Sequence, residues 1–367
     1  MQIAEFGQKH IFTTEGGIEV VVTELTKEFA KDNQVTVFNR WEVDKPKMEY
    51  PRVKNVRMIN VPTLSNGKLN AQLYSMLSSI QCLFDDYDVV HIHAEGPCVF
   101  IPLLKLAGKK VVVTIHGLDW QRAKWGKFAS AYIKLGETMA GKFADRIIVL
   151  NDETSYYFRD VFGRHTTMIK NGVTVYPTTK SDLIAKHGLK KGNYILYLGR
   201  IVPEKRLDLL CEAYKLSRSK KKLVIAGEIT DAVKEEPWYI EAKENKNIIF
   251  TGFAKGDLKN QLLCNTQLFV LPSDIEGMSI ALLEALGLGM RVLASDIKEN
   301  KQLLKKYGNS FKAGDVNDLA LKLKELSKLP FERSKAQYDW IKENYGWAQC
   351  AEKTKEVLED TVLNGRK

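Results

Sequence analysis

Short apolar runs alternate with segments of helical periodicity along most of the 367-residue chain, and this alternation constrains the fold most. In the first half the expected strands lie at 3–6, 35–38, 56–60, 89–92, 110–115 and 146–150. In the second half they lie at 194–198, 222–226, 248–251, 267–271 and 291–294. Alternation of this kind is typical of parallel sheets with crossover helices, so the pattern predicts an α/β protein built from doubly wound sheets.

The length of the chain predicts two domains, because one hydrophobic core rarely supports so many residues. Asn171-Gly172 is a strong turn signal, and a polar stretch rich in lysine follows it. We therefore expect a first domain over 1–173 and a second over 174–346, with a closing helix at about 347–367 that packs back on the first.

Composition narrows the possible partners and compartment. The 55 basic and 45 acidic side chains give a formal charge of +10, which favours anionic partners such as nucleotide phosphates or acidic lipid headgroups. No recognised nucleic-acid motif accompanies the charge, so nucleic acid is not expected. The absence of a long apolar run argues against a membrane-spanning helix, and the opening residues do not resemble a secretory leader. Five scattered cysteines without a C-x-x-C pair favour a reducing compartment and argue against structural zinc.

The segment SDIEGMSIALLEALGLG, residues 273–289, places polar groups between a strand and an apolar helix. Ser279 is the expected helix N-cap, and Glu284 is the only charge within the helix. A strand, a short loop and a helix N-terminus together hold anions and polyols at the carboxyl edge of a parallel sheet. Glu276 and Glu284 could then accept hydrogen bonds from sugar or ribose hydroxyls. Spacing alone leaves a second interpretation open, in which Glu284 pairs with a core arginine and Glu276 is solvated.

A second group of charges follows the strand at 194–198. The sequence GRIVPEKR begins with Gly199, and Arg200 and Lys205 then project from a loop that precedes a helix starting near Leu207. Two cations at the carboxyl edge of a sheet suit a diphosphate, because arginine forms a bidentate fork and lysine a point charge.

The first half carries its polar groups at the same kind of edge. Gly16 and Gly17 lie between the first strand and a helix, where backbone can approach a ligand, although the spacing is not that of a dinucleotide fingerprint. His116 and Asp119 lie just past the apolar strand at 110–115, which favours contact with a ligand over a histidine bonded inside a turn.

The segment from Trp120 to Lys134 mixes aromatic and basic residues. Such a mixture suits a surface that meets anionic headgroups or a lipid-linked phosphate, and it suits a packed helix with one wet face equally well. Its aromatic members are Trp120, Trp125, Phe128 and Tyr132, and its basic members are Arg122, Lys124, Lys127 and Lys134.

Two further patterns are not expected to bind metal. His91 and His93 share one face of the strand at 89–92, but no third ligand is near them in the sequence. The acidic cluster at 85–88 precedes the same strand and is interpreted as a solvated turn.

Together these motifs resemble a known family. GRIVPEKRLDLL and SDIEGMSIALLEALGLG look like the paired signatures of the retaining glycosyltransferases of family 4, which have the GT-B fold of two facing Rossmann-like domains with a cleft between them. The opening FGQKHIFTTEGGIEVVVTEL and the segment HGLDWQRAKWGKFASAYIKLGE are similar to bacterial rhamnosyltransferases that act on a lipid-linked sugar during cell-surface polysaccharide synthesis. The resemblance covers nearly the whole chain.

The resemblance implies a role for each motif residue. The catalytic set would be His116, Arg200, Lys205 and Glu276. Donor binding would add the ribose-binding acid, the glycine loop near the diphosphate and the backbone that follows Glu276, namely Glu284, Gly16, Gly17, Gly277, Met278 and Ser279. The acceptor or membrane surface would consist of Asp119, Trp120, Arg122, Lys124, Trp125 and Lys127.

The implied reaction is transfer of L-rhamnose from dTDP-rhamnose to a polyprenyl-diphosphate-linked saccharide, as in capsule synthesis, with no metal or other cofactor. The enzyme would be cytoplasmic and peripheral on the inner face of the cell membrane. Ser279-Ile280 stands where many members carry glycine or proline and then leucine, so a UDP-linked glucose or N-acetylglucosamine donor stays an alternative. A nucleotide-sugar epimerase and a non-catalytic nucleotide-binding module of the same fold are alternatives of another class.

Overall fold

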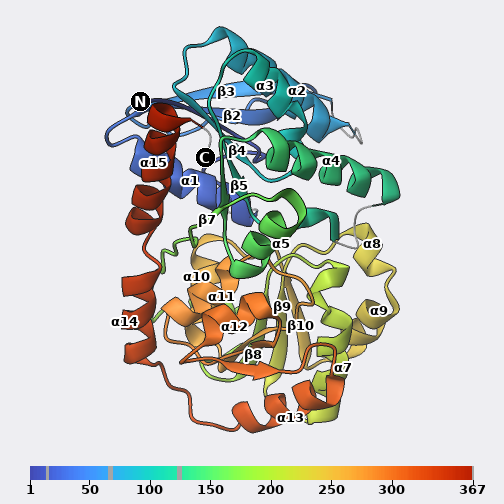
Figure 1. The fold of residues 1–367 in the computed structure, drawn as a ribbon. Helices are drawn as coiled ribbons and strands as arrows, with labels where there is room; N and C mark the ends of the chain where they lie inside the picture. Colours follow the sequence, from blue (N-terminus) through green and yellow to red (C-terminus); the bar gives the residue numbers. More distant parts are fainter. Residues whose placement is uncertain (14–15, 65–68, 122–125, 366–367) are drawn as a thin grey trace. The chain divides into compact units, whose positions relative to one another are not determined.

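A computed structural model describes residues 1–13, 16–64, 69–121 and 126–365 of the protein (Figure 1). The chain divides into two compact units, one formed by 1–172 with 347–367 and the other by 173–346. Each unit is built around one sheet of parallel strands with helices on its faces, which confirms the expected α/β class. No helix within the described residues is long and apolar enough to cross a membrane.

The sheet of the first unit has seven strands in the order β3-β2-β1-β4-β5-β6-β7. Its strands are β1 (Gln2–Phe6), β2 (Gln34–Glu42), β3 (Val56–Thr63), β4 (Val89–His93), β5 (Val111–Ile115), β6 (Arg146–Val149) and β7 (Thr167–Met168). The strand order reverses between β1 and β4, which pair in register with Glu5 opposite His91. Open sheets of this kind bind ligands at the carboxyl ends of the strands beside such a reversal.

Successive side chains of each strand point to opposite faces of this sheet and pack into two apolar cores, one on each face. Val111 and Val113 belong to one cluster, and Val112 belongs to the other. The second cluster also contains residues of α1 and of the closing helix, so the end of the chain packs on the first unit (Figure 1). The helices are α1 (Gly17–Phe29), α2 (Asn70–Phe84), α3 (Ile101–Leu106), α4 (Lys127–Phe143), α5 (Asp152–Phe162) and α15 (Trp347–Asn364), with 3-10 turns η1 (Gly96–Phe100) and η2 (Asp119–Gln121).

The sheet of the second unit has six strands in the order β10-β9-β8-β11-β12-β13. Its strands are β8 (Tyr194–Leu198), β9 (Lys222–Ala226), β10 (Ile248–Gly252), β11 (Leu268–Leu271), β12 (Val292–Ser295) and β13 (Asn309–Phe311). Here the order reverses between β8 and β11, which lie side by side and run parallel. The helices are α6 (Asp182–Ala185), α7 (Leu207–Ser217), α8 (Asp231–Lys234), α9 (Pro237–Glu244), α10 (Gly256–Asn265), α11 (Ile280–Gly287), α12 (Lys298–Leu304), α13 (Val316–Leu326) and α14 (Lys335–Asn344), with the 3-10 turn η3 (Pro203–Lys205).

The structure departs from the expected elements at their ends and edges. The edge strands β7 and β13 were not expected, because two or three residues carry no periodicity. The strand β2 extends four residues beyond the expected Phe38 to Glu42, where it stays paired with β3.

A close helix contact holds the carboxyl edge of the first unit in place. The glycine at position 136 of α4 lies against the chain that leads into η1, and a Cβ added there would lie 2.0 Å from the carbonyl oxygen of Glu95. That oxygen belongs to the backbone and cannot move away cheaply. Gly136 therefore sets how closely α4 approaches the loop after β4.

We expect Gly136→Ala to destabilise the protein by about 1–3 kcal/mol, because the added methyl group overpacks this contact. The measurement is the free energy of unfolding from denaturant titration. Gly96→Ala is the matched control, since its added Cβ would meet a Tyr132 ring carbon at 3.8 Å, an ordinary contact. Equal stability of the two variants would contradict the close contact.

Candidate functional site

Two loops meet where the strand order of the second unit reverses. One loop follows β8 and carries Lys205, and the other follows β11 and carries Glu276. The two side chains form an ion pair, although they lie 71 residues apart in the sequence. The lysine side chain is 13% exposed and the glutamate side chain 8%. The Ser273 hydroxyl donates a second hydrogen bond, of 2.7 Å, to Glu276 Oε1. The structure therefore brings one predicted cation and one predicted acid together at the edge where a ligand is expected.

Further polar contacts tie the two loops to each other. The Asp274 amide donates to the Glu204 carbonyl at 2.9 Å, and the Arg206 guanidinium donates to Asp274 Oδ2 at 3.0 Å. The Arg206 guanidinium also donates a hydrogen bond to Asp208 of α7. This hydrogen bond is the largest cause of the raised pKa of Arg206. Sequence reasoning missed Arg206 because its partner Asp274 lies on the other loop, 68 residues away in the sequence.

Arg200 lies in the loop that follows β8, the same loop that carries Lys205. Its side chain is exposed, and its backbone carbonyl accepts a 2.6 Å hydrogen bond from the Tyr197 hydroxyl. Burial and then the Glu276 carboxylate raise the pKa of Tyr197, and the Arg200 cation opposes them. Arg200 and Glu276 thus both lie near the same phenol ring, as charges around one site would.

The helix α11 begins beside the ion pair. Ser279 is its N-cap, as expected, and the Ser279 side chain accepts from the Leu282 amide at 3.3 Å. Gly277 is buried, and Met278 packs against the core of the second unit. The first-turn amides of α11 are oriented as the donor groups that bind anions at helix N-termini.

Glu284 has a partner that the sequence did not indicate. Its carboxylate accepts from Lys259 Nζ of α10 at 2.6 Å, and its side chain is 12% exposed. The second interpretation is therefore wrong on both counts: the partner of Glu284 is a lysine and not a core arginine, and Glu276 is paired with Lys205 and not solvated. Burial raises the pKa of this carboxyl, and the charge and hydrogen bond of Lys259 offset part of that rise. Nothing in the spacing of the chain relates Lys259 to Glu284.

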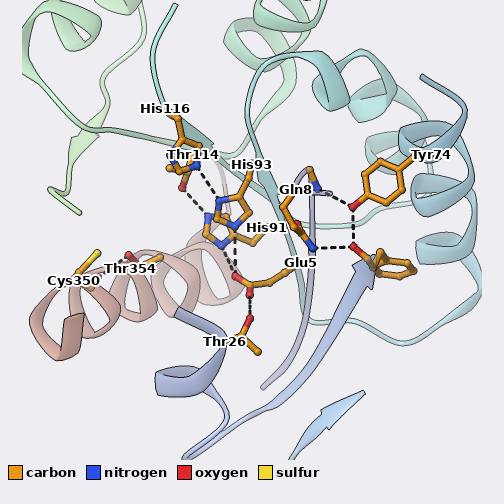
Figure 2. Close-up of polar contacts among 12 residues, drawn as sticks. Glu5, Gln8, Thr26, Tyr74, His91, His93, Thr114, His116, Cys350 and Thr354 are labelled. Carbon is orange, nitrogen blue, oxygen red and sulfur yellow. Dashed lines mark hydrogen bonds and ion pairs between the residues drawn. The ribbon is translucent and has the colours of Figure 1, made fainter. Parts of the chain in front are cut away.

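In the first unit, His116 follows β5 and lies at the end of a buried polar network (Figure 2). His116 Nε2 lies 3.2 Å from His93 Nδ1, and His93 Nε2 lies 3.6 Å from Glu5 Oε1. His91 Nδ1 bonds the same Glu5 oxygen at 3.0 Å, and Thr26 Oγ1 of α1 bonds Glu5 Oε2 at 2.8 Å. His116 is 8% exposed, whereas Glu5, His91 and His93 are fully buried.

The network explains two shifted pKa values. Burial tends to raise the pKa of Glu5, but hydrogen bonds and charges from His91 and His93 outweigh it and bring the pKa down to about 2. Burial lowers the pKa of His93 to about 4. At neutral pH the network therefore contains an ionised Glu5 and a neutral His93.

The same network corrects one sequence interpretation. His91 and His93 have a third potential ligand beside them, Glu5, and the three residues each offer one atom within 4.8 Å of the others. The sequence hid this neighbour because β1 and β4 pair across 86 residues. Two imidazoles and a carboxylate form a donor set that zinc accepts. Glu5 already forms hydrogen bonds with Thr26 and His91, and His91 forms a further one with Thr114.

The glycine loop of the first unit lies at the start of α1. Gly16 is the N-cap of this helix and Gly17 its first, exposed residue. A Cβ at Gly16 would lie 2.2 Å from Glu19 Oε2, so the glycine leaves room for that carboxylate. Glu19 Oε1 accepts from the Lys9 amide at 3.2 Å.

The aromatic and basic segment divides between packing and exposure. The indole of Trp120 donates to buried Glu137 Oε2 at 2.7 Å, and the Asp119 amide donates to Glu95 Oε2 at 2.8 Å. Both contacts favour the packed-helix interpretation for this end of the segment. Lys127 is exposed and Phe128 is 79% exposed, so the start of α4 offers an apolar and basic surface. Three further predicted surface residues, Arg122, Lys124 and Trp125, lie outside the described residues.

Glu95 is a buried acid that sequence reasoning missed. Burial and then the charges of Asp119 and Glu137 raise its pKa well above the ordinary value for glutamate. Its neutral form is therefore favoured beneath the loop that carries Trp120.

Each half of the chain matches the sequence model of a known protein family. Residues 15–175 match the sequence model of "Glycosyltransferase Family 4", and residues 179–360 match that of "Glycosyl transferases group 1". The chain is 28% identical over 335 residues to UDP-Gal:alpha-D-GlcNAc-diphosphoundecaprenol alpha-1,3-galactosyltransferase of Escherichia coli, covering 84% of this chain and 85% of that protein.

Solved structures share the fold. Sucrose-phosphate synthase of Thermosynechococcus elongatus superposes with a TM-score of 0.78 at 17% identity, over 99% of both chains. Anabaena Alr3699/HepE in complex with UDP and glucose superposes with a TM-score of 0.75 at 15% identity, over 98% of this chain and 100% of that chain. With two parallel sheets and both family matches in sequence order, the chain belongs to the glycosyltransferases of GT-B fold, in the group that combines a family 4 half with a group 1 half.

Proposed function

We propose that this glycosyltransferase moves a hexose from a nucleoside-diphosphate donor, with retention of anomeric configuration, to a lipid-linked saccharide in bacterial surface polysaccharide synthesis. The observation that carries the proposal is the ion pair of Lys205 and Glu276 at the strand reversal of the second unit. A cation and an acid at one sheet edge match the two ends of a sugar diphosphate, since phosphate needs cations and hydroxyls need acceptors.

The comparisons favour a UDP-linked donor. The Escherichia coli relative is named for UDP-Gal and for an acceptor on diphosphoundecaprenol, which supports a UDP-hexose and a lipid-linked acceptor here. The solved complex with UDP and glucose has the same fold. The sequence resemblance to rhamnosyltransferases keeps dTDP-rhamnose as the competing donor. Thermal stabilisation by dTDP-rhamnose, UDP-galactose, UDP-glucose or UDP-N-acetylglucosamine distinguishes them, because a ligand held only by the native state raises the melting temperature.

Donor binding would exchange the partners of the ion pair. The diphosphate would take Lys205 and Arg200, and hydroxyls of the transferred sugar would take Glu276. The amides at the start of α11 would add hydrogen bonds to the same ligand. Glu284, which accepts a hydrogen bond from Lys259, would accept another from a ribose hydroxyl. Each protein charge would keep a partner of suitable chemistry after the exchange.

The chemical step is a substitution on one face of the sugar. The bond from the anomeric carbon to the phosphate oxygen breaks, and the departing oxygen takes the proton of the acceptor hydroxyl. The acceptor oxygen then forms the new bond on the face that the phosphate leaves, which retains configuration. Lys205, Arg200 and the amides of α11 stabilise the negative charge that develops on the diphosphate. His116 of the first unit would contact the reacting sugar.

Two rival activities are separated by simple incubations. A nucleotide-sugar epimerase converts donor in the absence of acceptor, whereas a transferase leaves it nearly unchanged. A non-catalytic binding module binds donor and produces no new glycoside. Retention is read from the anomeric proton coupling of the product by NMR, and a requirement for metal from the rate in excess EDTA.

We expect Arg200→Ala and Lys205→Ala each to lower kcat by about 10²–10³-fold, because each removes a cation from the developing diphosphate charge. The measurement is the initial rate of transfer to a synthetic lipid diphosphate saccharide. Lys322→Ala on α13 is the control, since that side chain is 38% exposed and pairs only weakly with Glu325 at 3.9 Å. Near-normal turnover in both site variants would defeat the proposed function.

We also propose that the start of α4 meets an anionic membrane surface on the cytoplasmic side. The exposed Lys127 and Phe128 support it, together with the formal charge of +10. An exposed apolar side chain next to a basic group suits the headgroup boundary of a bilayer.

We therefore expect the intact protein to float with vesicles containing anionic phospholipid and not with zwitterionic vesicles. Phe128→Ser combined with Lys127→Ser should reduce the floated fraction several-fold, because charge contributes about 1 kcal/mol for each basic residue near the surface. A double variant that floats as well as the parent would exclude this surface.

A further inference from the structure

The buried network of the first unit leads from a carboxylate to the candidate catalytic histidine (Figure 2). It begins at Glu5 on β1, continues through His93 at the end of β4, and reaches His116 just after β5. These strands are neighbours in the sheet, in the order β1-β4-β5. Only the last member of the series is partly exposed.

Glu5 is held firmly at the buried end. Its two oxygens accept from His91 Nδ1 at 3.0 Å and from Thr26 Oγ1 at 2.8 Å. The Thr114 hydroxyl lies 2.8 Å from the far nitrogen of His91 and so fixes that ring as well. An ionised carboxylate can only accept hydrogen bonds, so the network has a fixed direction at Glu5.

That direction assigns the proton of His93. A neutral imidazole carries one proton, on one of its two nitrogens. Nε2 faces the Glu5 carboxylate at 3.6 Å, where a lone pair would be repelled and a proton attracted. The proton therefore lies on Nε2, and Nδ1 is the acceptor.

The assignment extends to the next ring. Because His93 Nδ1 accepts, His116 Nε2 at 3.2 Å must donate. The second nitrogen of His116, Nδ1, is then the acceptor of that imidazole. In this tautomer the ring accepts a hydrogen bond from a hydroxyl group, which is the chemistry a sugar or its acceptor offers.

We propose that His93 is a positioning residue that orients the His116 ring and fixes its Nε2-protonated tautomer, with Glu5 as the anchor of the series. The proposal rests on the proposed contact of His116 with the reacting sugar. Hydrogen-bond partners that orient a functional histidine from behind are known to control its tautomer and its basicity.

The kinetic test uses substitutions at position 93. His93→Leu removes the acceptor and should lower kcat about 10–100-fold while the KM for donor stays unchanged. His93→Asn places an amide oxygen where Nδ1 lies and should restore most of the lost rate. Tyr74→Phe is the control, because it removes a buried hydroxyl that bonds the Phe38 carbonyl and the Gly7 amide elsewhere at this edge.

A double variant decides whether His93 acts through His116. We expect His93→Leu combined with His116→Ala to lose no more activity than His116→Ala alone, since the two residues would then form one functional unit. Additive losses would overturn the proposal, as would a normal kcat in His93→Leu.

A spectroscopic readout keeps this test separate from the proposed function. Long-range proton–nitrogen correlations of histidine-labelled protein report the tautomer of each of the six histidines, with His116 assigned from the His116→Ala spectrum. The expected result is an Nε2-protonated His116 in the parent and loss of that single tautomer in His93→Leu. An unchanged His116 signal would overturn the positioning role even if no substrate were ever turned over. One equivalent of zinc or another transition metal in the purified protein would also overturn it, because Glu5 and His93 would then be ligands.

Discussion

The candidate site of the second unit is organised around one nearly buried ion pair, between Lys205 and Glu276. Removing two opposite charges from water costs free energy that only good pairing offsets, and removing one partner leaves the other uncompensated. The pair is fixed in place by the loops that carry it, which Asp274 ties together through Glu204 and Arg206. A ligand that separates the pair must supply a partner for each charge at once. A sugar joined to a diphosphate does so, whereas free phosphate or free sugar leaves one group unpaired.

The polar network of the first unit obeys a different rule. Glu5 keeps its partners, because both oxygens are bonded within a fully buried region and no part of the carboxylate reaches solvent. Its charge does not exchange with a ligand. In the proposed series, the Glu5 charge determines which nitrogen of His93 carries the proton, and through His93 which nitrogen of His116 does. In the proposed function the charges of the second unit change partners, whereas the charge of Glu5 in the first unit does not.

Local pattern predicted the framework well. The strands β8 and β9 begin and end at the expected residues, and Ser279 is the helix N-cap that its position indicated. Both results follow from interactions that span a few residues, namely the burial of apolar side chains in a strand and the capping of a helix turn.

Pairings between distant segments could not be predicted from the sequence. Lys259 meets Glu284 because α10 and α11 pack together, and Glu5 meets His91 because β1 pairs with β4. Neither contact leaves a periodicity or a motif in the chain. The expectation that the histidines had no third neighbour was wrong for this reason. The role of a buried charged residue therefore depends on partners that only the packing of distant elements brings to it.

The central claim is that Glu276 and Glu284 hold different parts of the donor, and titration calorimetry with UDP and with a UDP-hexose tests it most directly. UDP carries ribose and diphosphate but lacks the sugar. Glu284→Gln should therefore weaken both ligands, whereas Glu276→Gln should weaken only the UDP-hexose, each by about 10–100-fold for a lost hydrogen bond to a charged group. UDP should bind Glu276→Gln no less tightly than the parent, since Lys205 is then released from its pair. An equal loss of UDP and UDP-hexose affinity in Glu276→Gln would contradict the account.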